Sequence, residues 1–200
     1  MTAVAEAPYP VSLELLAPLE VARWRPLVHW LLSIPYYIVL YVLQIAVGVV
    51  TLIAWFAILF TGNIPRGMFD FMVSVNRFAW RFSSYYFFLR EPYPPFDVSG
   101  PATDPGTDPP TRFSVEYPDH LSRGLIFVKW LLALPHYIVL VFLFIGLAVA
   151  NLIGFFAVLI TGQWPEGLRN FIVGAHRWGY RVVAYVYLLT DVYPPFRLEP

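Results

Sequence analysis

Residues 61–67 read TGNIPRG, and the motif returns 100 residues later as TGQWPEG at residues 161–167. Each motif follows a long run without charge and precedes a segment that carries two arginines four residues apart. Glycine ends a helix by taking a left-handed conformation, and proline is favoured where the next helix begins. We therefore predict a helical hairpin at each motif, with the turn at Gly62 or Gly162.

The offset of 100 residues holds along nearly the whole chain. PYYIVL at 35–40 matches PHYIVL at 135–140, and YPPF at 93–96 recurs at 193–196. Self-similarity at one fixed period indicates an internal repeat. We predict two tandem repeats, at residues 1–98 and 112–200, joined by a Pro- and Gly-rich linker at 99–111.

The composition points to lipid as part of the solvent. Apolar residues make up 58% of the 200 residues and charged residues only 13%, about half the usual charged fraction. The runs at 36–60 and 137–160 carry no charge and are long enough to cross a bilayer. These features predict an all-α integral membrane protein in which each repeat is a two-helix transmembrane hairpin.

The second helix of each hairpin is ambiguous. Its polar residues, among them Asp70, Arg77 and Arg81, fall on a narrow stripe of a helical wheel. An interfacial amphipathic helix usually carries a broader charged face. We therefore predict a second spanning helix, and the interfacial alternative stays open.

Short segments precede each hairpin. Trp24 between two arginines, and Trp130 after Lys129, are typical of an interfacial segment at headgroup level. Apolar residues alternate at 11–15 and again at 113–117, which predicts short strands. We expect the strand and the YPPF tail of each copy to form a small cytoplasmic cap.

The basic residues predict the orientation. The flanks and linker hold seven of them and the two hairpin tips hold two, Arg66 and Arg169. This bias predicts a multi-pass protein with both termini and the linker in the cytoplasm. Two spans per copy would make the repeats parallel, related by an axis along the membrane normal.

The pattern Thr-Gly-x-x-Pro-x-Gly, then Arg-x-x-x-Arg, then Tyr-Pro-Pro-Phe resembles DUF4389, a bacterial family of unknown function. The resemblance covers two tandem copies, 10–98 and 112–198. It implies a membrane protein built from a repeated unit, and we expect it in the bacterial cytoplasmic (inner) membrane. The family has no assigned activity, so the resemblance implies no catalytic residues.

The candidate ligand-binding residues are Arg77, Arg81, Arg177, Arg181 and Asp70. The two arginines of each copy lie one turn apart on one face, and intramembrane arginine needs a partner. One interpretation is an anionic guest, such as a lipid phosphate or a carboxylate. The structural alternative is that the guanidinium groups bind carbonyls, stack on aromatic rings or extend to the headgroups.

Other chemistry finds little support in the sequence. The formal net charge is zero, which argues against nucleic acid as a partner. The chain has no cysteine, its histidines lack the spacing of a metal site, and no serine stands in a recognisable His-Asp arrangement. We expect no enzyme activity, no metal and no cofactor.

Two functions from different classes fit these observations. The first is a non-enzymatic membrane scaffold or accessory subunit of a larger complex, with a membrane-protein partner or a homo-oligomer. The alternative is a lipid-binding or transport protein that holds anionic headgroups at the repeat interface. A lipid-modifying enzyme ranks last because no acid, base or nucleophile is in evidence.

Overall fold

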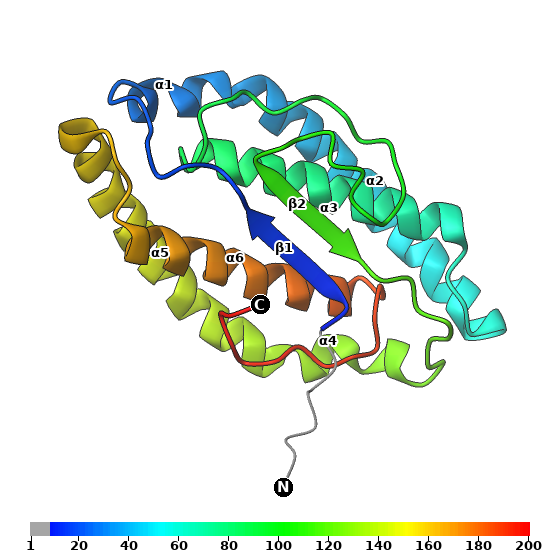
Figure 1. Ribbon diagram of the computed structural model, residues 1–200. Coiled ribbons are helices and arrows are strands. Elements are labelled where there is room, and N and C mark those ends of the chain that lie inside the picture. Colours follow the sequence, from blue (N-terminus) through cyan, green and yellow to red (C-terminus); the bar gives the residue numbers. More distant parts are fainter. Residues whose placement is uncertain (1–8) are drawn as a thin grey trace, which may run out of the picture.

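The computed structural model describes residues 9–200, so residues 1–8 of the predicted first repeat lie outside it. Each repeat contributes a strand, a short helical segment and two longer helices (Figure 1). The first repeat holds β1 (Val11–Leu15), α1 (Arg25–Leu32), α2 (Ile34–Thr61) and α3 (Arg66–Tyr86). The second holds β2 (Thr111–Val115), η1 (Leu125–Phe127), α4 (Lys129–Leu132), α5 (Leu134–Thr161) and α6 (Glu166–Val186).

The two hairpin turns form as predicted. Gly62 ends α2 and Gly162 ends α5, each in the left-handed region with φ of 77°. The N–H of Gly62 donates to the Ile58 carbonyl at 2.8 Å, which satisfies one of the last carbonyls of α2. Pro65 then stands directly before α3, where its fixed φ suits the start of a helix.

The two strands pair with each other across the repeats. β1 and β2 run antiparallel, and Leu13 lies opposite Phe113 at the equivalent position of the other copy. An antiparallel pair centred on equivalent residues is symmetric about an axis perpendicular to the sheet. The repeats are therefore related by a pseudo-two-fold axis that passes through this pair.

Each strand segment covers the other repeat. β2 packs on α3, and β1 packs on α6. The loops that follow continue the exchange, because Val21 N–H donates to the Gly162 carbonyl at 2.9 Å and Leu121 N–H to the Gly62 carbonyl at 2.8 Å. The predicted cap of strand and tail within one copy is therefore wrong. A lone strand leaves its backbone groups unpaired, and in the described chain its partner strand belongs to the other copy.

We expect this pairing to be testable by a disulfide, because the chain has no native cysteine. Ser12 and Ser114 are paired across the strands, and paired Cα atoms lie about 4.5–5.5 Å apart, within disulfide range. Ser12→Cys with Ser114→Cys should oxidise to an intramolecular bridge, seen as a gel shift that reductant reverses. Ser12→Cys with Asn63→Cys is the control and should stay reduced. Failure of the first pair to bridge would contradict the register.

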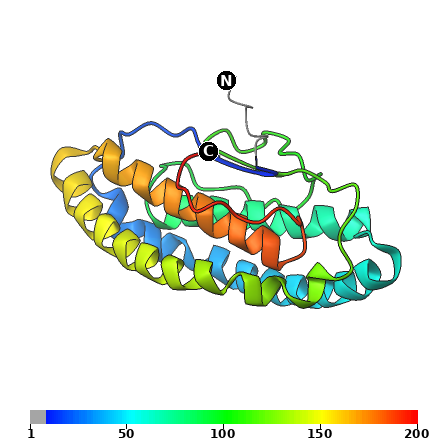
Figure 2. The same ribbon diagram turned by 90° about the horizontal axis from the view of Figure 1, so that it is seen from below.

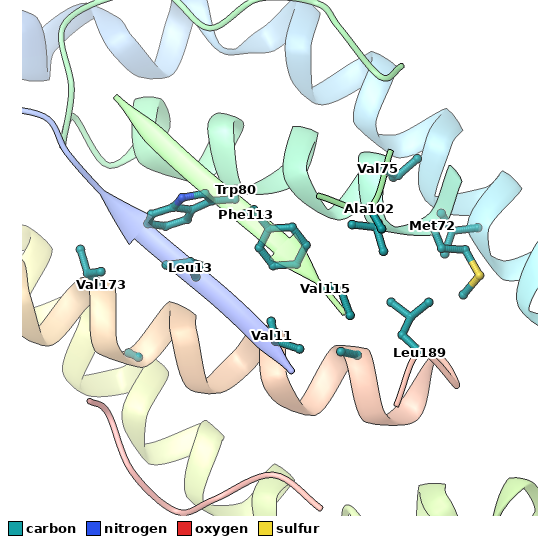
Figure 3. Close-up of a cluster of buried hydrophobic side chains, with 14 of the residues drawn as sticks. Val11, Leu13, Met72, Val75, Trp80, Ala102, Phe113, Val115, Val173 and Leu189 are labelled. Carbon is teal, nitrogen blue, oxygen red and sulfur yellow. The ribbon is translucent and has the colours of Figure 1, made fainter. Parts of the chain in front are cut away.

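The molecule is built in layers (Figure 2). α2 and α5 form one outer layer, α3 and α6 the middle, and the sheet with the linker the other outer layer. The apolar sides of the strands, including Leu13 and Phe113, point into a buried cluster that includes Trp80 of α3 and Val173 of α6 (Figure 3). Burial of these side chains fixes the sheet on the middle layer.

The long helices α2 and α5 run in opposite directions (Figure 1). Phe127, in η1, which precedes α4 and α5, packs edge-on against Trp55 near the end of α2, with ring centroids 5.0 Å apart. In the same way α1, just before α2, packs against α5. If these helices stood upright in a bilayer, the repeats would be inverted rather than parallel.

Two helices of the described chain, α2 and α5, are long and apolar enough to cross a membrane. Only 17% and 22% of their most apolar stretches are buried, so they are not core helices of an ordinary soluble domain. α3 and α6, predicted as further spans, fall outside this class. Their polar stripes are covered by the sheet, the linker and the C-terminal tail instead.

Candidate functional site

The polar stripe of α3 faces the sheet and the linker, and Arg77 is its best-anchored residue. The Nε of Arg77 donates to the Phe113 carbonyl at 3.0 Å. Its Nη2 donates to the carbonyls of Pro101 and Ala102 at 2.9 and 3.0 Å. The Asp104 carboxylate lies 3.4 Å from Nε, and both side chains are buried. Arg77 therefore joins the two repeats and the linker.

Arg81 lies one turn further along α3 and binds the same linker. It donates to the Asp97 carbonyl at 3.2 Å and to the Thr107 hydroxyl at 3.0 Å. Asp108 lies 3.8 Å from its Nε and also forms a two-point ion pair with Arg90. Such paired contacts are the strongest geometry between arginine and a carboxylate.

Asp70 also binds the linker. One carboxylate oxygen accepts the backbone N–H of Ala102 at 3.0 Å, and the other pairs with Arg66 at 3.2 Å near the surface. The anions that match the arginines of α3 are Asp104 and Asp108, which lie more than 25 residues along the chain from Arg77. No local pattern marks them, so sequence reasoning missed these partners.

The arginines of α6 bind carbonyls. Arg177 donates from Nε and Nη2 to the Leu13 carbonyl at 3.2 Å, the counterpart of the bond from Arg77 to Phe113, and from Nη1 to Leu198 at 2.8 Å. Among the described residues, no carboxylate lies within ion-pair distance of Arg177. Arg181 donates to the carbonyls of Arg197 and Glu199 at 3.2 and 2.7 Å.

Arg177 also lines a polar cavity of about 510 Å³ between β1 and α6. Arg169, Glu14 and Glu166 line the same cavity. Two carboxylates beside two guanidinium groups leave no excess of positive charge. This cavity is therefore a poor match for the anionic guest.

A second cavity, which we call the trough, lies between the repeats on the side away from the sheet. Its volume is about 560 Å³, within the range of small-molecule sites. α3 and α6 form its floor, and α2 and α5 provide its walls, among them Phe144 and Tyr137. Both wall residues are exposed on the apolar face of α5, so the trough opens on that face.

Polar groups gather on the floor of the trough. They are Asn76 and Ser83 of α3 with His176 and Tyr180 of α6, and Gln44 joins them from the wall. Tyr180 and Ser83 hydrogen-bond to each other. None of the described lining residues is Lys, Arg, Asp or Glu. The trough is an apolar site with a small uncharged polar patch.

The sequence held one signal for the trough. Asn76 and His176 occupy equivalent positions that differ between the copies, and Gln44 interrupts an apolar run. The histidines show no metal spacing in the sequence, which indicated ordinary interfacial or core residues. Within residues 9–200, no three His, Asp or Glu side chains are grouped to hold a metal ion.

These observations define a class: a two-repeat, mostly helical protein with two long apolar helices and a strand pair exchanged between the repeats. The profile of the family "Domain of unknown function (DUF4389)" matches residues 23–97 and again 123–197. The chain therefore belongs to this family and carries two copies of its unit. Comparisons with curated proteins and with solved structures gave no match.

Proposed function

We propose that the chain is a non-enzymatic membrane protein that lies flat in one leaflet and binds a membrane lipid in the trough. The observation that carries this proposal is the opening of the trough on the apolar face of α2 and α5. A lipid that enters from the leaflet would reach the floor without leaving the apolar phase.

The position of the sheet supports the flat orientation. Arg77, near the middle of α3, binds the centre of the sheet, so the sheet lies beside the helices and not at their ends (Figure 2). Upright helices would hold the outer face of the sheet, with exposed Glu14, near the bilayer centre. Charge at that depth costs about 2.5–3.5 kcal/mol per residue or more. Flat helices keep the sheet in water.

The flanking residues suit the same orientation. Trp24 and Trp30 of the first repeat and Trp130 of the second are exposed beside the long apolar helices. Indole rings favour the headgroup level, and the guanidinium group of Arg25 lies 4.6 Å from the ring of Trp24. We propose the cytoplasmic leaflet of a bacterial inner membrane, where basic residues meet anionic headgroups.

The arginines do not serve as the lipid site in this proposal. Arg77, Arg81 and Arg181 are buried and bind the linker, the sheet or the C-terminal tail. Extracting them for a ligand would leave buried carbonyls without donors and would remove the guanidinium group that pairs with the buried Asp104 carboxylate. The proposed ligand therefore lies in the trough, on the side of α3 and α6 opposite the arginines.

A scaffold or accessory subunit is the second candidate. The same apolar face carries many large exposed side chains, including Phe60 and Phe142, and a membrane-protein partner or a second copy could cover them. Contiguous apolar surface of this kind marks either a lipid or a protein contact. The two candidate functions differ in which molecule should stay bound to the protein after extraction from the membrane: a lipid for the first, and a protein partner or second copy for the scaffold.

The test is gentle detergent extraction followed by native mass spectrometry. We expect one lipid per chain, and about tenfold less retained lipid in Gly179→Phe, which places a ring on the trough floor. The nearest atom to a Cβ at Gly179 is 3.8 Å away, so the backbone tolerates the change. A stoichiometric protein partner without lipid would favour the scaffold.

The matched control is Gly167→Phe on the same helix. A Cβ at Gly167 meets nothing within 4 Å, and the residue lies outside the trough lining. This variant should retain lipid like the parent. Equal lipid loss in both variants would mean that general disturbance of α6, and not occupation of the trough, explains the result.

A further inference from the structure

Asn76 and His176, at equivalent positions of the trough floor, present the same kind of group. The Nδ2 of Asn76 donates to the Met72 carbonyl at 2.9 Å, four residues back on α3. The Nδ1 of His176 lies 2.8 Å from the Ile172 carbonyl, four residues back on α6. A carbonyl only accepts, so this Nδ1 carries the hydrogen. Two different side chains at equivalent positions thus each donate one hydrogen bond to the carbonyl four residues back.

Each side chain still has an acceptor available, and Asn76 also keeps a second N–H. Burial lowers the pKa of His176 to about 4, so the ring is neutral at physiological pH and its Nε2 bears a lone pair. No described residue meets the Oδ1 of Asn76 or the Nε2 of His176. Asn76 is 3% exposed and His176 8%, yet neither acceptor atom is among the fully enclosed atoms that lack a partner, so both open into the trough. An acceptor in an apolar cavity without a donor is costly.

The chemistry of the trough lining limits the class of lipid that can bind. An anion would meet the two acceptors, a few neutral donors and no cation among the described lining residues, so the loss of its hydration would be poorly compensated. A pure hydrocarbon would leave both acceptors unmet. A hydroxyl head can donate to one acceptor, and its oxygen can accept from Gln44 or from the one hydroxyl hydrogen that the bond between Ser83 and Tyr180 leaves free.

We infer that the trough selects a lipid alcohol, a neutral amphiphile whose hydroxyl head donates to Asn76 or His176 while its chain lies between α2 and α5. This inference rests on the proposed lipid site and specifies its ligand. It also accounts for the difference between Asn76 and His176 at equivalent positions. Both side chains supply an acceptor, but their shapes differ on the two sides of the pseudo-two-fold axis.

The test uses three photoactivatable probes in phosphatidylcholine vesicles that carry the full chain: a sixteen-carbon alcohol, its methyl ether and the matched carboxylic acid. They share one chain and differ only at the head. We expect the alcohol to label peptides of α3 and α6 about tenfold more than the ether, as one or two hydrogen bonds allow. We expect the carboxylate at neutral pH to label them no more than the ether.

Substitutions at the floor provide the second readout. Asn76→Leu with His176→Leu should reduce alcohol labelling to the level of the ether. His176→Asn should keep it, because Asn76 shows that an amide there can donate to the carbonyl four residues back and leave its oxygen free. Thermal unfolding of each variant checks that the fold is retained, and the comparison of probes on the unaltered chain needs no variant.

The outcomes separate the two proposals. Equal labelling of the trough by alcohol and ether, or preference for the carboxylate, would overturn the alcohol inference and leave a lipid site in place. Loss of alcohol labelling in His176→Asn equal to that in the double leucine variant would also overturn it. Absence of trough labelling by all three probes would overturn the lipid site itself.

Discussion

Replacing Arg77 by leucine should destabilise the protein far more than the same change at Arg177. Arg77→Leu removes the guanidinium partner of the buried Asp104 carboxylate, which keeps only two backbone N–H donors, and it leaves the carbonyls of Pro101 and Phe113 without a donor. Removing one partner of a buried ion pair costs about 3–5 kcal/mol. Arg177→Leu strands only carbonyls, at about 1–3 kcal/mol. For a chain of this size the first change should lower Tm by roughly 10 °C.

Thermal unfolding in vesicles, followed by tryptophan fluorescence, measures the loss of stability in Arg77→Leu and in Arg177→Leu. Arg77→Lys is the control for charge, and it should recover only part of the stability because an ammonium group cannot bridge three carbonyls and a carboxylate. Adding Asp104→Asn to Arg77→Leu should relieve much of the cost, since the stranded charge is removed. Equal losses at Arg77 and Arg177 would contradict the role given to Asp104.

The orientation of the protein in the membrane should decide whether introduced single cysteines react with a membrane-impermeant thiol reagent in intact cells, and we expect either full reaction or none. In the flat arrangement Asn63, Gln163 and Thr103 lie on the cytoplasmic side, and all three are exposed. A cysteine at any of them should stay unlabelled in intact cells and react fully after lysis. A cysteine at Leu52, on the apolar face of α2, should react only after detergent removes the lipid.

The alternatives give different patterns in the same experiment. Four spans with cytoplasmic termini would expose Asn63 and Gln163 to the outside together. Upright, antiparallel α2 and α5 would expose only one of these two tips. Labelling of either tip in intact cells would therefore contradict the flat orientation, and the number of labelled tips would identify its replacement.

Local signals in the sequence predicted the local structure. Gly62 and Pro65 marked the hairpin turn, the uncharged run marked α2, and alternation marked β1. The second strand, predicted at 113–117, begins and ends two residues earlier, at Thr111–Val115. Each of these features depends on a few neighbouring residues, so a window of sequence contains the cause.

The long-range features could not be read in this way. Alternation tells which side of β1 is buried but not which strand pairs with it, so the exchange between repeats was invisible. Asp104 and Asp108 looked like linker residues because their partners, Arg77 and Arg90, are distant along the chain. The trough depends on the packing of α3 against α6, which brings Asn76 and His176 to the lining of one cavity, and only the fold shows that packing.

The exchanged strands have a consequence for assembly. The matched unit of the family spans residues 23–97 or 123–197, and in this chain each unit is covered by a strand that belongs to the other copy. Two units on separate chains would have to find each other, and their association would depend on protein concentration. Tandem linkage makes that encounter intramolecular, with an effective concentration in the millimolar range for a short flexible linker. The duplication thus converts what would be a dimer into a fold whose completeness does not vary with expression level.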